Sequence, residues 1–248
     1  MLLDTYRKSV DDLFAEIRET QTENIIKAGA LIADSIKAGG NIYLSGICHY
    51  MEYDVLDRGG GPAFYKPFHY NLDLTNHTSH NQAHPRPDLP VDGNMEGLAA
   101  YALKKAHIGR GDVLFVGSVS GRTASVVDLA YEAEKRGVRV IAFTSMKYAR
   151  AVDAVHSSGK KLYEMVTLVI DNCAPAAEAM LEVKGLDSRY AAASGIASDY
   201  SRWSITSVAV DELLRRGKAP GILRSANFPG GIDYNEGTVY PNYNKTGF

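Results

Sequence analysis

The first forty residues carry apolar side chains at the spacing of an α-helix. One set recurs at i, i+3, i+4 and i+7, and a second set continues the 3.6-residue period: Val10, Leu13, Phe14 and Ile17, then Ile25, Ala28, Ile32 and Ile36. This pattern predicts one long helix, or a pair of helices, with a single buried face. Gly39-Gly40 ends the helical pattern.

Beyond residue 40, short apolar runs alternate with amphipathic segments. Strands are predicted at 41–45, 112–116, 138–143 and 167–170, and helices at 50–58, 95–107, 123–136, 148–155 and 188–216. Strands with little polar interruption, alternating with helices, are typical of a parallel sheet that is covered on both faces. The pattern therefore predicts an α/β fold in three layers, with an N-terminal helical arm.

Two segments lack this periodicity. Residues 68–93 are rich in His, Asn, Pro and Asp and sparse in apolar side chains, as functional lids and connecting loops are. Residues 218–248 are expected to form an irregular tail that either covers a site or anchors the terminus. We therefore expect one domain over 1–248, made of N-terminal helices 1–40, an α/β core 41–217 and this tail.

The composition is that of a soluble globular protein. The 248 residues are 45% hydrophobic, enough to bury a core without a disulfide framework, which two cysteines could not supply anyway. Lys and Arg total 27 against 29 Asp and Glu, a balance that argues against nucleic acid or an anionic membrane as a partner. Because no signal peptide and no apolar run of ~20 residues is visible, we expect a cytoplasmic protein.

The sharpest local feature is the turn at 116–123, which follows a predicted strand and opens a predicted helix. In a parallel α/β sheet such turns lie at the carboxyl edge, where ligands bind. Gly121 permits close approach of the backbone. Ser118, Ser120 and Thr123 offer three hydroxyls on one rim, beside the unpaired N–H groups of a helix N-terminus. This chemistry suits a phosphate or another tetrahedral anion, and helix capping by Ser118 or Ser120 is the alternative.

Three competing motifs are missing. The segment 117–121 has the outline Gly-x-Ser-x-Gly of a nucleophile elbow, but Val119 stands where the nucleophile would be. Gly109-Arg-Gly111 precedes a strand rather than a helix, and Leu114 replaces the third glycine of a dinucleotide-binding fingerprint. A Walker Gly-Lys-Ser/Thr is also absent from the sequence. NAD and ATP therefore have no support, and we expect no cofactor.

At this loop the sequence resembles the sugar isomerase (SIS) domain family. The family's phosphosugar-binding loop reads Ser-x-Ser-Gly-x-Thr, which Ser118-Val-Ser-Gly-Arg-Thr123 matches at every position. Further likeness at 95–114, 156–173 and 225–231 is to an uncharacterised bacterial branch near phosphoheptose isomerase. The resemblance implies a five-stranded parallel sheet with flavodoxin-like strand order. It also implies a homodimer or homotetramer with sites near the subunit interfaces.

One strand end departs from the pattern of that branch. The family segment Gly-Thr-Gly-His-Ser, whose serine helps hold the phosphate, is replaced here by Gly46-Ile-Cys-His-Tyr50. A phenol in place of the serine reshapes the anion site, so Tyr50 is expected to contact the substrate. Free sugars, sugar acids and sulfonated sugars are therefore candidate substrates beside sugar phosphates.

Aldose–ketose isomerisation needs a base that moves a proton between adjacent carbons through an enediol. The resemblance implies a carboxylate on the helix after the first strand, where Glu52 lies nearest the loop, together with a histidine. His49 and His156 are the candidate proton carriers, because an imidazole titrates near neutral pH. A solvated helix face for Glu52 and a structural role for each histidine are the alternatives.

Two further site residues are predicted nearer the C-terminus. Glu178, with Glu182 four residues later, is expected to lie on one helical face that reaches the pocket, unless both are solvated. Asn227 lies in the segment that resembles the SIS branch, and it is expected to contact the substrate from the tail.

The His-rich stretch raises the question of a metal. His77, His80 and His84 could present three imidazoles to zinc and leave an open coordination position. The stretch has the composition of a lid loop and lacks the spacing of a closed structural site. We therefore expect no metal and keep these three histidines as the only candidate ligands.

These features together predict an SIS-fold enzyme that acts on a sugar or sugar phosphate, with aldose–ketose isomerisation as the leading activity. Lyase, etherase or deglycase chemistry on a sugar derivative is one alternative, and a non-catalytic sugar-phosphate sensor is another. The first forty residues show no basic helix-turn-helix signature, which favours an enzyme over a DNA-binding regulator.

Overall fold

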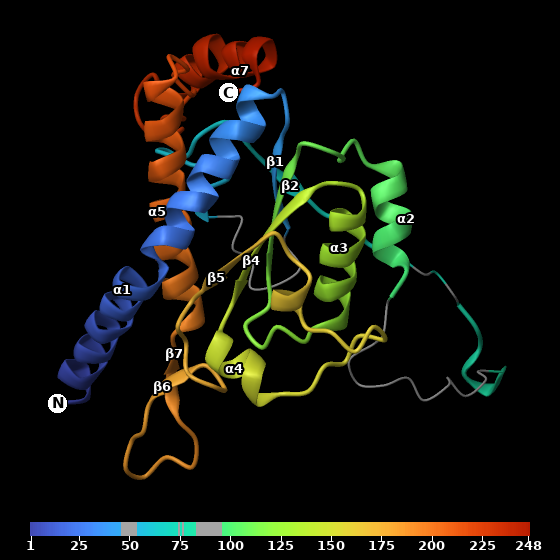
Figure 1. The fold of residues 1–248 in the computed structure, drawn as a ribbon, viewed down its shortest axis with the longest axis vertical. Coiled ribbons are helices and arrows are strands. Elements are labelled where there is room, and N and C mark those ends of the chain that lie inside the picture. The colour runs from blue at the N-terminus through green and yellow to red at the C-terminus, as the bar shows by residue number, and fades with distance from the viewer. Residues whose placement is uncertain (46–53, 74, 76, 83–95) are drawn as a thin grey trace.

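A parallel sheet between two layers of helices forms the body of the protein, and a long N-terminal helix runs along it (Figure 1). The computed structural model describes residues 1–45, 54–73, 75, 77–82 and 96–248. The helices are α1 (Leu2–Lys37), α2 (Leu98–Lys105), α3 (Ala124–Lys135), α4 (Met146–Ala151), α5 (Ser194–Arg215), α6 (Gly231–Tyr234) and α7 (Tyr240–Thr246). The strands are β1 (Ile42–Ser45), β2 (Tyr65–Phe68), β3 (Val113–Gly117), β4 (Arg139–Thr144), β5 (Leu168–Asp171), β6 (Ala179–Leu181) and β7 (Tyr190–Ala192). Shorter helical turns are η2 (His80–Gln82), η3 (Leu162–Glu164) and the π-helical η4 (Asn235–Val239).

The five strands β1 to β5 form one sheet in the order β2-β1-β3-β4-β5, and all neighbours are parallel. This is the flavodoxin-like order, so the predicted fold class is confirmed. The chain leaves β1 toward β2 on one side and returns to β3 on the other. The carboxyl ends of β1 and β3 therefore flank the topological switch point, where α/β sheets bind ligands.

The two faces of the sheet bury alternate residues of its central strands. Along β3, Val113 and Phe115 belong to the core that α1 and α5 cover, whereas Leu114 and Val116 belong to the core under α2 and α3. β4 repeats this alternation. Successive side chains of a strand point to opposite faces, so a nearly continuous apolar run serves both layers. The near-absence of polar residues from these strands thus has a direct structural cause.

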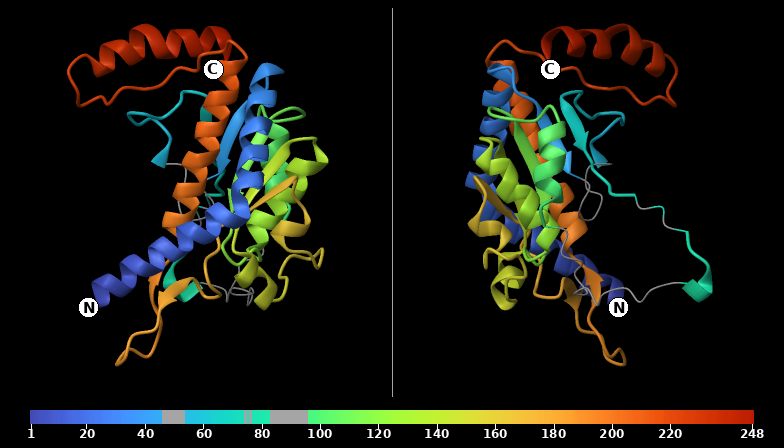
Figure 2. Two further views of the ribbon diagram at one scale, coloured as in Figure 1. Left: turned by 60° about the vertical axis from the view of Figure 1, so that its left-hand side comes forward. Right: turned by 90° about the vertical axis from the view of Figure 1, so that its right-hand side faces the viewer.

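Helices α1 and α5 lie side by side over one face of the sheet (Figure 2). Their backbones approach closely at Gly29, where an added Cβ would lie 2.5 Å from the Cβ atom of Val208 and 3.0 Å from the amide nitrogen of Ala209. Within the described residues, no helix combines the length and the apolar character that crossing a membrane requires.

Replacing Gly29 by Ala is expected to lower the free energy of unfolding by about 1–3 kcal/mol, because the new methyl group overpacks the α1–α5 contact. A urea titration followed by circular dichroism measures the change. Gly195→Ala is the matched control, since a Cβ at that helical position meets nothing within 4 Å. An equal loss of stability in both variants would show that the close contact is not the cause.

Several elements differ from their predictions. β2 lies at the edge of the sheet and is missed because its run Tyr65-Lys-Pro-Phe is short and contains Pro67, a residue that edge strands tolerate. Helix α5 begins at Ser194 rather than at residue 188, because the residues before it form the β6–β7 hairpin. In the predicted helix 50–58, the described residues 54–58 form tight turns, with a φ of +48° at Asp57.

The C-terminal segment is helical, so the prediction of an irregular tail over 218–248 is wrong for residues 231–246. Helices α6, η4 and α7 follow one another without a break, and Figure 2 shows them lying across the end of α5. The π-helical turn η4 interrupts the 3.6-residue period, and it buries only Asn235 and Val239. The apolar spacing that identifies an ordinary amphipathic helix is therefore absent from the sequence.

Candidate functional site

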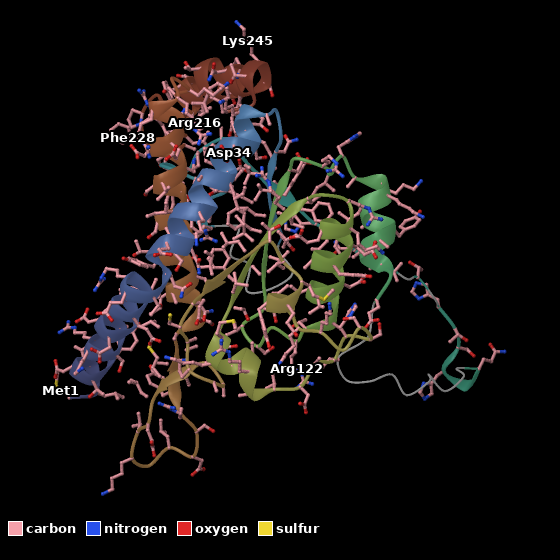
Figure 3. The ribbon with its side chains drawn as sticks, in the orientation of Figure 1. Met1, Asp34, Arg122, Arg216, Phe228 and Lys245 are labelled. Carbon is pink, nitrogen blue, oxygen red and sulfur yellow. The ribbon has the colours of Figure 1, made fainter. Side chains whose placement is uncertain are left out.

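The loop 118–123 joins β3 to α3 at the carboxyl edge of the sheet, where Figure 3 labels Arg122. β1 and β3 are paired up to Leu44 and Phe115, so β1 ends beside the start of this loop. The loop therefore lies at the topological switch point, the position that its place between a strand and a helix predicts.

Hydrogen bonds hold the loop in one conformation. The amide of Gly121 donates to the carbonyl of Ser118 at 3.0 Å, which closes a tight turn. The amide of Ser145 donates to the carbonyl of Val119 at 2.9 Å. The amide of Leu162 donates to the carbonyl of Gly121 at 2.8 Å. The β4–α4 connection and η3 thus brace the loop from two sides.

Glycine is required at position 121 for two reasons. Its φ of +64° lies in the left-handed region that other residues rarely adopt. An added Cβ would lie 3.0 Å from Thr144 Oγ1 and 3.1 Å from Ala149 Cβ. The loop therefore fits against the next strand and helix only without a side chain at this position.

The three hydroxyls of the loop do not share one rim. Ser118 is 1% exposed, and its Oγ lies 2.9 Å from the Oγ1 atom of Thr123, whereas Ser120 is half-buried and Thr123 is exposed. The prediction is wrong for Ser118 because a buried hydroxyl needs a partner, and Thr123 provides it. Ser120 and Thr123 remain at the surface beside the N-terminus of α3.

The capping alternative does not apply to α3. Thr123 is its N-cap residue, and no side chain makes a cap hydrogen bond there. The amide of Val126 donates to the carbonyl of Thr123 at 3.0 Å, which leaves the first-turn amides of Ala124 and Ser125 for another acceptor, with the positive end of the helix dipole behind them.

The loops that follow β4 and β5 continue the same edge. Ser145 Oγ donates to the carbonyl of Ala174 at 2.6 Å, and the amide of Ala174 donates to the side-chain oxygen of Asn172 at 3.1 Å. The amide of Asn172 donates to the carbonyl of Thr144 at 2.9 Å. These bonds join the ends of neighbouring strands into one surface beside the loop 118–123.

Glu178 lies at this edge but not on a helix. Ala177 and Glu178 have φ values of +62° and +70°, which end any helix, and β6 separates Glu178 from the exposed Glu182. The predicted shared helical face is therefore wrong. The carboxylate of Glu178 instead accepts from Ser194 Oγ at 2.9 Å, and its carbonyl accepts from the amide of Ala193 at 3.0 Å. Both contacts place Glu178 at the start of α5, in a strained backbone of the kind that clusters at functional sites.

His156 is buried in a polar cluster with Glu96, which precedes α2, and with Asp128 of α3. Its Nδ1 atom accepts from the amide of Ser158 at 3.2 Å, so the hydrogen-bond network assigns the proton of the neutral ring to Nε2. Nε2 faces Asp128 Oδ1 at 3.7 Å and Glu96 Oε2 at 3.9 Å. With 6% of the residue exposed, this geometry suits a link between the two helices and the loop after α4.

Replacing His156 by Ala is expected to lower the free energy of unfolding by about 2–3 kcal/mol, because a cavity opens beside two carboxylates. Thermal denaturation measures the change, and the exposed His107 supplies the control variant His107→Ala. A stable His156→Ala protein that has lost turnover would instead assign proton transfer to this ring.

Of the predicted residues that precede the loop, the structure describes only His77 and His80. His77 and His80 are exposed, and η2 lies away from the sheet in Figure 1. Within the described part of the chain, no three His, Cys, Asp or Glu side chains are arranged to hold a metal ion. Four predicted residues lie outside the described residues: His49, Tyr50, Glu52 and His84.

Asn227 does not reach the loop within one chain. It is exposed and directly precedes Phe228, which Figure 3 labels at the opposite end of the molecule from Arg122. The prediction is wrong for a single chain because the segment after α5 lies at the amino edge of the sheet, away from the loops described above.

A buried arginine on α5 has no recognisable motif in the sequence. Arg202 is 2% exposed; its Nη2 pairs with Asp199 and lies 3.5 Å from Asp54 Oδ2. Trp203 Nε1 donates to the same Asp54 oxygen at 3.3 Å. Burial raises the pKa of Asp199, and the positive charge of Arg202 offsets part of this rise. The only signal in the sequence is an arginine at a position of α5 where the helical period predicts a buried side chain.

Comparisons with known proteins agree with this architecture. The model of the family described as SIS domain matches residues 5–145. A UPF0309 protein of Shouchella clausii is 31% identical over 236 residues, which cover 94% of each chain. A UPF0309 protein of Oceanobacillus iheyensis is 31% identical over 232 residues, covering 93% of this chain and 92% of the other. Among solved structures, a Bacteroides fragilis protein assigned as a phosphosugar isomerase involved in capsule formation has the same fold. Its TM-score is 0.50 at 14% identity, over 88% of this chain and 93% of that one.

Proposed function

Because the chain belongs to the SIS domain family, we propose that it is an enzyme that interconverts an aldose and a ketose, as free sugars or as sugar phosphates. The observation that carries the proposal is the braced loop 118–123 at the topological switch point, beside the uncapped N-terminus of α3. First-turn amides with the hydroxyls of Ser120 and Thr123 suit a phosphate or another anionic end of a sugar. The buried hydroxyl of Ser118 positions the hydroxyl of Thr123 through the hydrogen bond between them.

Glu178 is the proposed base among the described residues. It lies at the carboxyl edge, where its carboxylate accepts from Ser194, the first residue of α5. In the forward direction the carboxylate takes the proton from C2 of the aldose, and the C–H electrons form an enediolate with its charge on O1. The proton then returns to C1, while the proton of the C2 hydroxyl moves to O1, which yields the ketose. His49, Tyr50 and Glu52 are proposed to assist from the segment after β1.

Solvent deuterium tests the reaction directly. The protein is incubated in D2O with panels of phosphorylated and free aldoses, and NMR follows the signals of C1 and C2. Incorporation of deuterium at either carbon is the expected result. Loss of a leaving group would instead indicate lyase or deglycase chemistry, and thermal stabilisation by a sugar without exchange would indicate a sensor.

Self-association is part of the proposal. The first buried residue of α1 is Leu13, and the preceding turns project past the body with Leu2 and Leu3 exposed (Figure 2). A projecting helix end with exposed leucines suits contact with a second copy, as a homodimer or homotetramer. In such an assembly Asn227 would contact a site only across a subunit interface. Light scattering measures the mass in solution.

A further inference from the structure

The buried face of α5 carries a stripe of polar side chains, which we call the α5 stripe: Ser194, Ser198, Ser201 and Arg202. Their spacing of i, i+4, i+7 and i+8 places them on one side of the helix. All four are nearly inaccessible, with exposed fractions of 4%, 3%, 0% and 2%. The stripe begins at the carboxyl edge, where Ser194 donates to Glu178, and it runs from there along the covered face of the helix.

Part of this stripe lacks the partners that buried polar groups need. Among the described residues, four fully buried side-chain atoms have no hydrogen-bond partner. One is Nε2 of His156, and the other three lie on this stripe: Ser201 Oγ, Arg202 Nε and Arg202 Nη1. Buried polar groups in native proteins are nearly always hydrogen-bonded, because a buried donor without an acceptor loses the free energy of its hydration and gains nothing in return. Three unmet groups on adjacent residues therefore point to a ligand that completes them.

The carboxylates around Arg202 leave these donors free. Asp199 and Asp54 both approach Nη2, so they hold the guanidinium in one orientation. Nε and Nη1 are not used by either carboxylate. A guanidinium fixed in this way is suited to bind an oxyanion, because its remaining N–H groups are already oriented.

We infer that the α5 stripe is a second wall of the sugar site, in which Arg202 binds the reacting end of the sugar. Nε and Nη1 donate to the oxygen on which negative charge develops in the enediolate, and Ser201 hydrogen-bonds a hydroxyl of the carbon chain. No bond to Arg202 forms or breaks. The inference rests on the proposed function and adds the group that stabilises the charge of the enediolate. It also names the ligand class that should bind best, a phosphorylated sugar acid, because its planar carboxylate resembles the enediolate.

Matched ligands of equal length test this role. Isothermal titration compares 6-phosphogluconate with glucitol 6-phosphate, which differ only in a carboxylate against a neutral alcohol at C1. We expect the unmodified protein to bind the acid at least about tenfold more tightly, a ratio typical of one charge-assisted hydrogen-bonded contact. Arg202→Lys is expected to bring the ratio close to one. Arg58→Gln is the matched control, since Arg58 pairs with the same Asp54 from an exposed position and should leave the ratio unchanged.

A second variant keeps the test independent of the ion pairs. Ser201→Ala removes a buried hydroxyl without a partner, so its melting temperature should stay the same or rise. Its affinity for both compounds should nevertheless fall severalfold. A purely structural hydroxyl would give the opposite pattern, a lower melting temperature with unchanged affinity.

The outcomes separate the inference from the proposed function. Equal affinity for the acid and the alcohol in the unmodified protein, or an equal loss of both in Arg202→Lys, overturns the role of Arg202 and leaves the anion site at 118–123 standing. Failure of both compounds to bind the unmodified protein would contradict that anion site as well, and the α5 stripe would lose its function with it.

Discussion

Replacing Glu178 by Gln is expected to slow deuterium exchange at the reacting carbon by about 10²–10⁴-fold, the usual contribution of a general base. Glutamine keeps the shape of the side chain, and its amide oxygen can still accept from Ser194 Oγ, which now bonds to the carboxylate at 2.9 Å. It cannot take a proton from carbon. NMR measures the exchange rate in D2O with the sugar that exchanges fastest in the unmodified protein, at matched occupancy of the site.

Glu182→Gln provides the control for the same chemical change. Glu182 is four residues further along the chain but is exposed on the β6–β7 hairpin. Its variant should exchange at the unmodified rate. If Glu178→Gln also exchanges at that rate, the base lies elsewhere, and Glu52 becomes the carboxylate to change next.

Gly121→Ala is expected to weaken binding of inorganic phosphate and of sugar phosphates by about tenfold to a hundredfold. The methyl group would lie 3.0 Å from Thr144 Oγ1 and 3.1 Å from Ala149 Cβ, so the loop must move away from the β4–α4 connection. Backbone strain of about 1–3 kcal/mol at such a position corresponds to roughly this loss when it falls on the anion-binding amides. Isothermal titration of the folded variant measures the affinities.

Gly159→Ala separates the contact from the conformation. Gly159 has a φ of +69°, close to the +64° of Gly121, but a Cβ there meets nothing within 4 Å. This variant bears the same conformational cost in open space, so its phosphate affinity should be unchanged. Equal affinities in the two variants would mean that the loop 118–123 does not hold the anion.

The predicted core strands are present because they are buried on both faces, which requires apolar residues at every position. The stretches 113–116 of β3 and 140–143 of β4 satisfy this condition, and both strands are found within one residue of their predicted bounds. β2 carries Lys66 and Pro67, as a sheet edge permits, so its sequence has no comparable run. The β6–β7 hairpin has strands of three residues, too short for an alternation to be recognised.

The residues of the candidate site also divide into those that the sequence could place and those that it could not. The loop 118–123 could be placed from the sequence, because a turn between a parallel strand and its following helix always reaches the carboxyl edge. Glu178 was predicted on a helix that left-handed residues at 177 and 178 prevent. Arg202 gave no signal as a candidate site residue, because Asp54, one of its two carboxylate partners, comes from a different segment of the chain.

The sequence by itself determined the parallel sheet, the long N-terminal helix and the place of the glycine-containing loop at the sheet edge. These features follow from local hydrophobic periodicity and from the chirality of strand–helix connections. Both can be recognised within one continuous segment of the sequence. Only the tertiary structure decided which polar groups meet: Ser118 turns inward to Thr123, and Trp203 and Arg202 close on Asp54, which lies 149 residues before Trp203. Burial and hydrogen-bond satisfaction depend on what lies opposite a side chain in space, and the spacing of residues within one segment does not contain that information.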